Sequence, residues 1–189
     1  PCTAKKMEAA REEFKHGDQP DVDLVLTTQE LIRMIKEAGI RFNELPDEAP
    51  DMPFGLGTGA GVIFGATGGV MEAALRTAVE TLTGETLEHV DFQAVRGTAG
   101  IKEAEYDVAG MKIRVAVASG LGNAQTLLDR VKNGEADYQF IEIMGCPGGC
   151  VDGGGQPIQS PDVRRRVDVK AARAKALYNL DASMTYRKS

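Results

Sequence analysis

The chain has 189 residues, a length typical of one domain or a large part of one. Hydrophobic residues make up 42% of it, enough for a packed core, and the formal net charge of −6 argues against a nucleic-acid-binding function. No run of about 18 apolar residues is present, so the sequence predicts no membrane-spanning helix. Three cysteines are too few and too unevenly spaced for the disulfide framework of a small secreted protein.

The first part of the chain predicts a helix, a strand and a second helix. Lys5–Phe14 is charged and contains alanine, and we expect it to form a short helix. Val22–Leu26 is apolar and β-branched, which is typical of a buried strand. The apolar residues between positions 31 and 38 have helical spacing, and either Thr27 or Thr28 offers an N-cap for that helix.

The rest of the chain alternates further helices with strands. Residues 43–54 carry three prolines and several acids and predict a surface loop, and a glycine-rich segment follows at 55–69. Beyond it we expect helices at Met71–Leu82, at Ala124–Lys132 and from Ser160 to about Tyr178, and strands at Phe92–Arg96 and Tyr138–Ile143. Ile101–Val108 and Lys112–Ala118 are expected to form a pair of strands around Ala109–Gly110. This alternation predicts an α/β fold with a mostly parallel sheet flanked by helices.

A second glycine-rich stretch contains two of the three cysteines. Cys146 and Cys150 are four positions apart, with Pro-Gly-Gly between them and three more glycines soon after. The third cysteine, Cys2, lies near the start of the chain. Because few side chains stand near the two thiols, a bulky group has access to the backbone there. We therefore expect the three thiolates to meet at one iron–sulfur site.

The residues alone leave other interpretations open. By their spacing alone, Cys146 and Cys150 are also compatible with buried, unreactive thiols. A disulfide between them is possible, but the glycine-rich run suits access of a ligand better. A zinc site is disfavoured because the chain has no Cys-x-x-Cys pair and both histidines, His16 and His89, lie in ordinary polar contexts. The stretch from Gly55 to Ala60 formally matches a dinucleotide-binding pattern, but no strand precedes it. No Walker phosphate-binding loop is present.

Three segments together resemble one known family. Pro1-Cys-Thr-Ala-Lys-Lys-x-Glu8 resembles the second signature of the iron-only (FeFe) hydrogenases, and Glu142-x-Met-x-Cys-Pro-Gly-Gly-Cys-x-x-Gly-Gly-Gly-Gln156 resembles their third. Between them, Gly-x-Ile-Phe-Gly-x-Thr-Gly-Gly-Val-Met-Glu-Ala-Ala-Leu-Arg76 is similar to the middle of the same domain. The resemblance extends from residue 1 to about residue 178, and two long signatures in the family's order make a chance match a poor explanation.

The resemblance implies a particular cofactor, the H-cluster. It consists of a 4Fe–4S cubane joined through one cysteine to a two-iron subcluster with carbon monoxide, cyanide and a bridging dithiolate. By resemblance, Cys2, Cys146 and Cys150 are three of the four cubane ligands, and Cys150 is the bridge to the two-iron subcluster. Soft thiolates of this kind suit iron–sulfur clusters. The implied reaction is the reversible reduction of protons to dihydrogen.

The resemblance also assigns residues around the two-iron subcluster. Lys5 would donate a charge-assisted hydrogen bond to a cyanide ligand, and Met144 would pack against the subcluster as a soft, adaptable side chain. The backbone at Pro1 and the Phe64–Gly65 pair would line the pocket. Glu8 is expected to orient Lys5 or to cap the first helix.

Finally, the resemblance predicts what accompanies this chain. Residues 1–189 would be the C-terminal portion of the catalytic domain, namely one lobe plus the C-terminal part of a two-lobed architecture. An upstream segment or a separate chain would supply the fourth cysteine, and any ferredoxin-like modules would also lie outside this chain. The electron carrier would be a ferredoxin or a cytochrome. No nucleic-acid partner and no membrane-spanning segment are expected. The alternative is a non-catalytic relative, either an H-cluster sensor or an iron–sulfur assembly factor; a small-molecule binder with structural cysteines is a third option.

Overall fold

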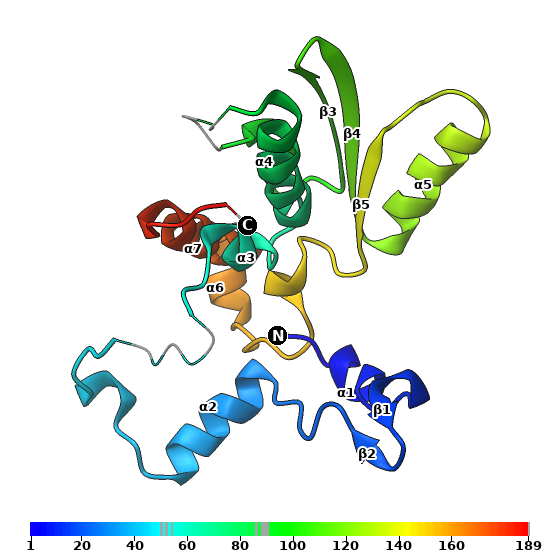
Figure 1. Cartoon of the computed structure of the whole chain (residues 1–189). Helices are drawn as coiled ribbons and strands as arrows, with labels where there is room; N and C mark the ends of the chain where they lie inside the picture. The colour runs from blue at the N-terminus through cyan, green and yellow to red at the C-terminus, as the bar shows by residue number, and fades with distance from the viewer. Residues whose placement is uncertain (50, 52, 54, 86, 88–90, 189) are drawn as a thin grey trace. The chain divides into compact units, whose positions relative to one another are not determined.

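The structure is a computed structural model that describes residues 1–49, 51, 53, 55–85, 87 and 91–188 (Figure 1). The chain forms two compact units. Unit 1 comprises Pro1–Gly55 and Gly153–Ser160, and unit 2 comprises Leu56–Asp152 and Pro161–Ser189. None of the helices formed by the described residues combines the length and the apolar character needed to cross a membrane. Positions 50, 52 and 54 of the predicted 43–54 loop, and His89, lie outside the described residues.

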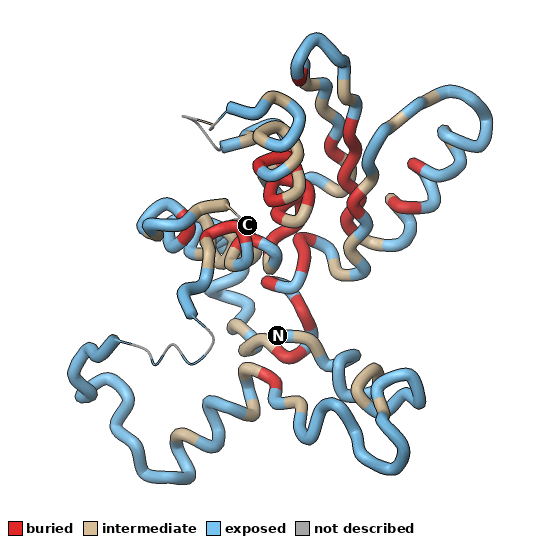
Figure 2. The backbone as a smooth tube through the Cα atoms, viewed as in Figure 1, coloured by how far each residue is buried: buried red, intermediate tan, exposed pale blue. Residues whose placement is uncertain are grey.

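Unit 1 consists of short elements joined by irregular segments. They are α1 (Ala4–Glu8), η1 (Glu12–Phe14), β1 (Lys15–His16), β2 (Gln19–Pro20), α2 (Thr28–Glu37) and η2 (Phe42–Glu44), where η denotes a 3₁₀-helix. The two short strands pair antiparallel. Figure 2 shows that unit 1 is mostly exposed, and Thr27 is one of its few buried residues.

The predicted cap of α2 is confirmed. The Thr27 hydroxyl accepts a hydrogen bond from the Glu30 backbone N–H at 3.2 Å, and the Glu30 carboxylate accepts one from the Thr27 backbone N–H at 2.8 Å. This reciprocal arrangement is a capping box, which satisfies two amides that the first helical turn leaves without partners. The bond from the Thr27 backbone lowers the pKa of Glu30 to about 2.

Two predictions for unit 1 are wrong. The helix expected over Lys5–Phe14 ends at Glu8, and the chain continues as the 3₁₀-helix η1. The buried strand expected over Val22–Leu26 does not form, and Val22, Leu24 and Leu26 are exposed. A strand needs a neighbour for its backbone hydrogen bonds, and the described part of unit 1 pairs no segment with these residues.

Unit 2 contains the sheet and the longer helices. Its elements are α3 (Gly59–Ile63), α4 (Gly69–Thr83), η3 (Gln93–Val95), β3 (Ile101–Val108), β4 (Met111–Ser119), α5 (Leu121–Lys132), β5 (Phe140–Met144), η4 (Cys150–Asp152), α6 (Pro161–Arg166) and α7 (Val169–Ser183). The strand order is β3-β4-β5, with β4 in the centre. The predicted helices at 71–82 and 124–132 and the predicted pair of strands at 101–118 are thereby confirmed, with small shifts in their ends.

The core of unit 2 lies on both faces of β4. Val115 and Val117 pack with Met71 and Leu75 of α4, whereas Ala116 and Ala118, which point the other way, pack with α5 through Leu127 and its neighbours. The side chains of a strand alternate between faces, so one short strand joins two hydrophobic clusters. Figure 2 shows the buried positions along α4 and β4. The α/β class predicted from the sequence is confirmed.

Three further expectations for unit 2 need correction. The sheet is mixed rather than mostly parallel, because β3 and β4 form an antiparallel hairpin and only β4 and β5 run parallel. The strand expected at Phe92–Arg96 is a 3₁₀-helix that buries Val95. The single helix expected from Ser160 is divided into α6 and α7, since Asp168 starts α7 as a new N-cap by accepting a hydrogen bond from Ala171 N.

A buried ion-pair network connects α4 to the end of α7. The Arg76 guanidinium donates to the Asp181 carboxylate at 2.8 and 2.9 Å and to Glu72 at 2.7 Å, and all three side chains are completely buried. Arg96 and Arg187 add further contacts to Glu72 and Asp181 from the rim. Buried charges are tolerated when they are paired and hydrogen-bonded in this way.

Candidate metal centre

The loop that carries two cysteines follows β5 directly and reverses the chain. Gly149 N donates to Cys146 O at 3.0 Å, and Gly148 and Gly149 have φ angles of +87° and +93°. Side-chain-bearing residues rarely adopt these angles, which accounts for the adjacent glycines. Cys146 is half-buried and Cys150 is exposed, and both are present as thiols.

This cysteine loop packs backbone to backbone against the turn that follows α3. Thr67 N donates to Gly148 O at 3.1 Å, and Val151 N donates to Gly65 O at 2.9 Å. A Cβ atom at Gly149 would lie 2.6 Å from Thr67 N, so only glycine permits the approach. The glycine-rich segment at 55–69 therefore serves as the support for the cysteine loop.

Ser119, the last residue of β4, fixes the loop from the other side. Its hydroxyl accepts a hydrogen bond from Gly148 N at 2.6 Å and donates one to Cys146 O at 3.1 Å. The residue is 1% exposed, so water does not compete for these bonds. Ser119 was not among the residues predicted from the sequence. The available signal was its hydroxyl at the end of an apolar strand, directly before a glycine.

Glu142 and Lys102 form a buried polar support beneath the same turn. The Glu142 carboxylate accepts hydrogen bonds from Gly68 N at 2.6 Å and Met71 N at 2.7 Å, at the start of α4. Lys102 Nζ donates to Thr67 O at 2.8 Å, and burial lowers the pKa of this lysine to about 8 although Glu142 opposes the shift. For Glu142, a charge within the otherwise apolar strand β5 was the signal that the sequence offered, whereas Lys102 lies in a strand with several charged residues and gave no such signal.

Of the other predicted site residues of unit 2, Gly65 contacts this loop and Met144 lies next to it in the chain, whereas Phe64 is adjacent only to Gly65. Gly65 holds Val151 through its carbonyl, and Phe64 precedes it with its side chain about half exposed. Met144 is the last residue of β5 and is half-buried, and its carbonyl accepts Gly120 N at 2.7 Å. The structure thus brings Gly65 to the cysteine loop directly.

The remaining predicted site residues belong to unit 1. Pro1 O accepts a hydrogen bond from Gly155 N at 2.6 Å, which ties the start of the chain to the segment that follows Cys150 in the sequence. Cys2 is half-buried next to this bond. Lys5, in α1, forms an ion pair with Glu8, as the sequence suggested for Glu8, and its side chain is exposed.

The donor atoms suit an iron–sulfur group. Cys146 and Cys150 offer two soft ligands from one glycine-lined loop, and the backbone around them is fixed by Ser119 and by the turn at residues 65–67. Among the described residues, no group of three or more His, Cys, Asp or Glu side chains is arranged to hold a metal ion. Cys2 lies in the other unit, and its meeting with Cys146 and Cys150 stays a prediction.

Comparison with known proteins shows the family to which the chain belongs. Residues 1–154 match the family model described as iron only hydrogenase large subunit, C-terminal domain. Over all 189 residues, the chain is 51% identical to the NADP-reducing hydrogenase subunit HndD of Solidesulfovibrio fructosivorans and covers 32% of it. It is 47% identical over the same length to iron hydrogenase 1 of Clostridium pasteurianum and covers 33% of that protein. The chain is also 35% identical to protein NAR1 of Arabidopsis thaliana, and the match covers 82% of this chain and 36% of that protein.

Solved structures agree with the sequence matches. A variant of the FeFe-hydrogenase HydA1 from Chlamydomonas reinhardtii superimposes with a TM-score of 0.75 at 42% identity, over 100% of this chain and 54% of that one. The structure of HydA(deltaEFG), which concerns stepwise FeFe-hydrogenase H-cluster assembly, superimposes with a TM-score of 0.74 at 41% identity, over 100% of this chain and 53% of that one. The chain therefore spans about a third of the length of the first two curated relatives and about half of the solved chains.

Proposed function

Because the chain belongs to the family formed by the C-terminal domain of iron-only hydrogenase large subunits, we propose that it forms part of a catalytic site that reversibly reduces protons to dihydrogen. The observation that carries the proposal is the rigidly supported Cys146–Cys150 loop, which presents two thiols on a backbone with few side chains. When bound there, the H-cluster would supply the redox chemistry, as cofactors generally do.

The proposal gives each site residue a task. Cys2, Cys146 and Cys150 would hold the cubane as three of its ligands, and Cys150 would also hold the two-iron subcluster. Lys5 would donate a charge-assisted hydrogen bond to a cyanide ligand, and its ammonium is paired with Glu8 in the described structure. Met144, Phe64, Gly65 and the Pro1 backbone line the pocket and keep water out.

The bond from Gly155 to Pro1 supports the inclusion of Cys2 in the ligand set. The segment 153–156 begins three residues after Cys150, and it contacts the Cys2 loop through this bond and through a close approach of Gly154 to Thr3. Gln29 adds two side-chain hydrogen bonds to the same segment, at 2.9 Å to Gln156 O and 3.4 Å to Gly154 O. The third signature is thereby bonded to the second.

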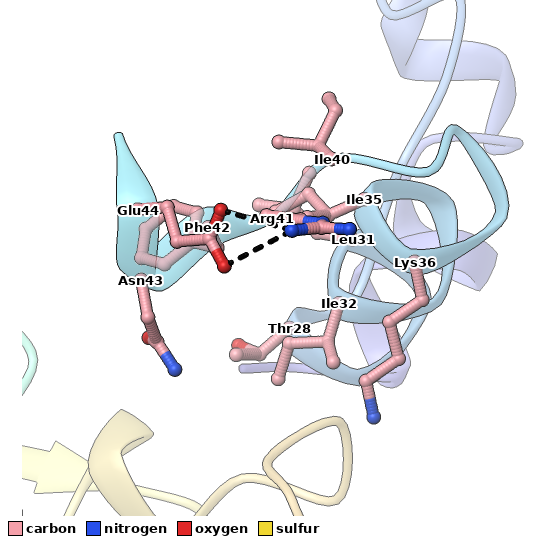
Figure 3. A pocket seen from close by; sticks show the side chains of 10 residues that line it. All are labelled: Thr28, Leu31, Ile32, Ile35, Lys36, Ile40, Arg41, Phe42, Asn43 and Glu44. Atoms are coloured by element: carbon pink, nitrogen blue, oxygen red, sulfur yellow. Dashed lines mark hydrogen bonds and ion pairs between the residues drawn. The ribbon is translucent and has the colours of Figure 1, made fainter. Parts of the chain in front are cut away.

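We also propose that further polypeptide, upstream in the same chain or separate from it, supplies the fourth thiolate and packs against unit 1. The described residues of unit 1 include no buried large hydrophobic side chain. The apolar face of α2, formed by Leu31, Ile32 and Ile35, lines an open hollow of about 550 Å³ together with Phe42 of η2 (Figure 3). Exposed apolar surface of this kind is typical of a face that packs against another segment.

The decisive experiment produces the chain in a host that makes the H-cluster, alone and together with an upstream hydrogenase segment that contains a cysteine. We expect infrared bands of metal-bound carbon monoxide and cyanide, and hydrogen evolution from reduced viologen, only with the added segment. Lys5→Asn should lose most of both signals, whereas Lys6→Asn, at the neighbouring lysine that contacts Val25 O and Glu30, should keep them. Equal loss in both variants, or full activity of the isolated chain, would contradict the proposed site.

The second candidate is a non-catalytic relative, because several proteins named as cytosolic iron–sulfur assembly components are about 35% identical to this chain. The hydrogenases at 47–52% identity are more similar. Lys5 and Met144 favour the enzyme, since their proposed tasks concern the two-iron subcluster alone. Iron bound by the completed protein without carbon monoxide or cyanide bands would favour the assembly factor.

A further inference from the structure

A buried lysine stands behind the cysteine loop. Lys102 of β3 is 8% exposed, and its Nζ donates to two neutral backbone carbonyls, Thr67 O at 2.8 Å and Gly97 O at 2.9 Å. Neutral partners compensate a buried charge only in part. Burial therefore lowers the pKa of Lys102 to about 8, although Glu142 opposes the shift.

The contacts of Lys102 suit both of its protonation states. A neutral amine has two N–H groups, and an ammonium has three. The two carbonyls use two of these groups, and the part of the chain that the structure describes offers no third hydrogen-bond acceptor to Nζ. Lys102 therefore gains or loses one proton without giving up a hydrogen bond to the protein.

One of the two carbonyls brings Lys102 within reach of solvent. Gly97 is exposed and lines an open hollow of about 380 Å³ together with Arg96, Thr98 and Tyr178. A single residue thus separates the buried amine from a surface that water reaches, so the amine is able to exchange protons with solvent.

The other carbonyl connects Lys102 to the cysteine loop. Thr67 accepts from Lys102 through its oxygen, and its N–H donates to Gly148 O at 3.1 Å. Gly148 lies between Cys146 and Cys150 in the sequence. Thr67 is 2% exposed, so water does not screen this connection, and charges interact more strongly there than in solvent. All of these residues belong to unit 2, and a change of charge on either side is felt on the other.

Other charged and titratable side chains surround this lysine. They are Glu142 on β5, Glu72 and Arg76 on α4, Arg96 after η3, Tyr106 on β3, and Tyr178 and Lys175 on α7. Both arginines bind Glu72. Burial raises the pKa of the two tyrosines, so they stay protonated below about pH 10. Lys175 is exposed, and solvent screens its charge. Lys102 is therefore the buried member of this group that titrates near neutrality.

We propose that Lys102 is a redox-linked protonation site, which binds one proton from solvent when one electron reaches the group held by the Cys146–Cys150 loop. This inference rests on the proposed function, because it needs a redox group at the cysteines. The added electron makes the loop more negative, which favours the ammonium over the amine. The proton adds to the lone pair of Nζ, and no other bond forms or breaks. The uptake offsets the added charge inside the protein.

The pH range of the coupling follows from the sign of this change. Without the electron Lys102 titrates near pH 8, and with it the pKa rises. Below about pH 7 the lysine is protonated in both states and adds no pH dependence. Above about pH 8 each electron brings a proton. The ratio of reduced to oxidised group at a fixed potential should then fall by up to about tenfold per pH unit, until the raised pKa is reached.

The first measurement concerns the lysine itself and needs no cluster. The full chain, labelled with nitrogen-15 in its lysines, is titrated by NMR from about pH 6 to about pH 11. We expect one lysine with a midpoint near pH 8, present in Lys112→Met and missing from Lys102→Met. Lys112 is the matched control, because it lies on the same hairpin but is exposed and paired with Glu105. Midpoints above about pH 10 for every lysine would overturn the proposal.

The second measurement follows the completed, cluster-loaded protein by infrared spectroelectrochemistry at one fixed potential. Between about pH 8 and 10, the ratio of reduced to oxidised cluster should fall at least about threefold less in Lys102→Arg than in the parent or in Lys112→Met, because a guanidinium stays charged. Below about pH 7, Lys102→Arg should match the parent, whereas Lys102→Met should hold several-fold less of the reduced form. A purely structural role of Lys102 would not produce this dependence on charge and pH.

The outcomes separate the two proposals. Missing carbon monoxide and cyanide bands would contradict the proposed function, and this inference with it. With those bands present, a parent ratio that stays constant between about pH 8 and 10, or one that changes equally in the parent and in both Lys102 variants, would overturn the role of Lys102 alone. The parent curve and its NMR titration involve no substitution, so they decide the proposal even where a variant does not fold.

Discussion

Replacing Ser119 with alanine should loosen the cysteine loop, because one hydroxyl satisfies two backbone groups of that loop. Ser119→Ala removes the acceptor of Gly148 N and the donor to Cys146 O, at a position that is 1% exposed. A buried group left without a partner costs about 1–3 kcal/mol. Only Gly148 N is left without this partner, since Cys146 O still accepts from Gly149 N, so the substitution should lower the free energy of unfolding by about 1–3 kcal/mol.

The assay is urea unfolding of the full chain, with Thr126→Ala as the control. The Thr126 hydroxyl donates to Gly122 O within α5 on an exposed face, so its removal should change the free energy of unfolding by less than about 0.5 kcal/mol. A second measurement reports on the loop itself. Cys146 is half-buried in the parent protein, and its rate of alkylation should rise several-fold in Ser119→Ala, whereas that of Cys2 should stay constant.

Equal stability of the two variants, together with an unchanged alkylation rate of Cys146, would contradict this role of Ser119. That result would mean that the contacts at residues 65–67 hold the loop without the serine. A loss of stability without faster alkylation would assign Ser119 to the general packing of β4 and remove it from the metal centre.

Three further changes test the surroundings. Asp181→Asn should destabilise unit 2 by about 3–5 kcal/mol, because it removes one of the two buried carboxylates that pair with Arg76. Burial opposes ionisation of Asp181, but hydrogen bonds from Arg76 and Arg187 keep its pKa below the usual value, so the contribution is present above about pH 4 and should fade from thermal melts at lower pH. Gly149→Ala should cost about 2 kcal/mol or more in urea unfolding, because its φ is +93° and its Cβ would meet Thr67 N. For Lys102, the folded pKa of about 8 lies below the unfolded value, so stability relative to Lys102→Met should rise between about pH 8 and 10; a flat difference would contradict the burial argument.

Local patterns in the sequence predicted the elements whose stability is local. The capping box of α2, the long helix α4 and the hairpin of β3 and β4 each depend on residues within one short segment. The cysteine loop was likewise recognisable, since its glycines answer a backbone requirement that can be read from the sequence.

The sequence did not predict features that depend on distant partners. Val22–Leu26 has the composition of a strand, but a strand also needs a partner. The two described strands of unit 1, β1 and β2, pair only with each other. The hairpin of β3 and β4 was expected from the sequence, but the sequence does not show that only one further strand, β5, joins it among the described residues, so the expectation of a mostly parallel sheet was wrong. Ser119 became a candidate only when the fold placed it beside Gly148, 29 positions away in the sequence.

The proposed ligands differ in how strongly the fold orders them. Cys146 and Cys150 belong to a unit with two hydrophobic clusters, and their loop is held by β4, by the turn after α3 and by α7. Cys2 belongs to a unit whose described residues bury no large hydrophobic side chain, and its loop is held mainly through Gly155. Metal affinity includes the free energy needed to order the ligands. The proposed cluster would therefore gain its third thiolate at the expense of ordering unit 1, and any segment that packs on the apolar face of α2 would tighten cluster binding without touching a metal atom.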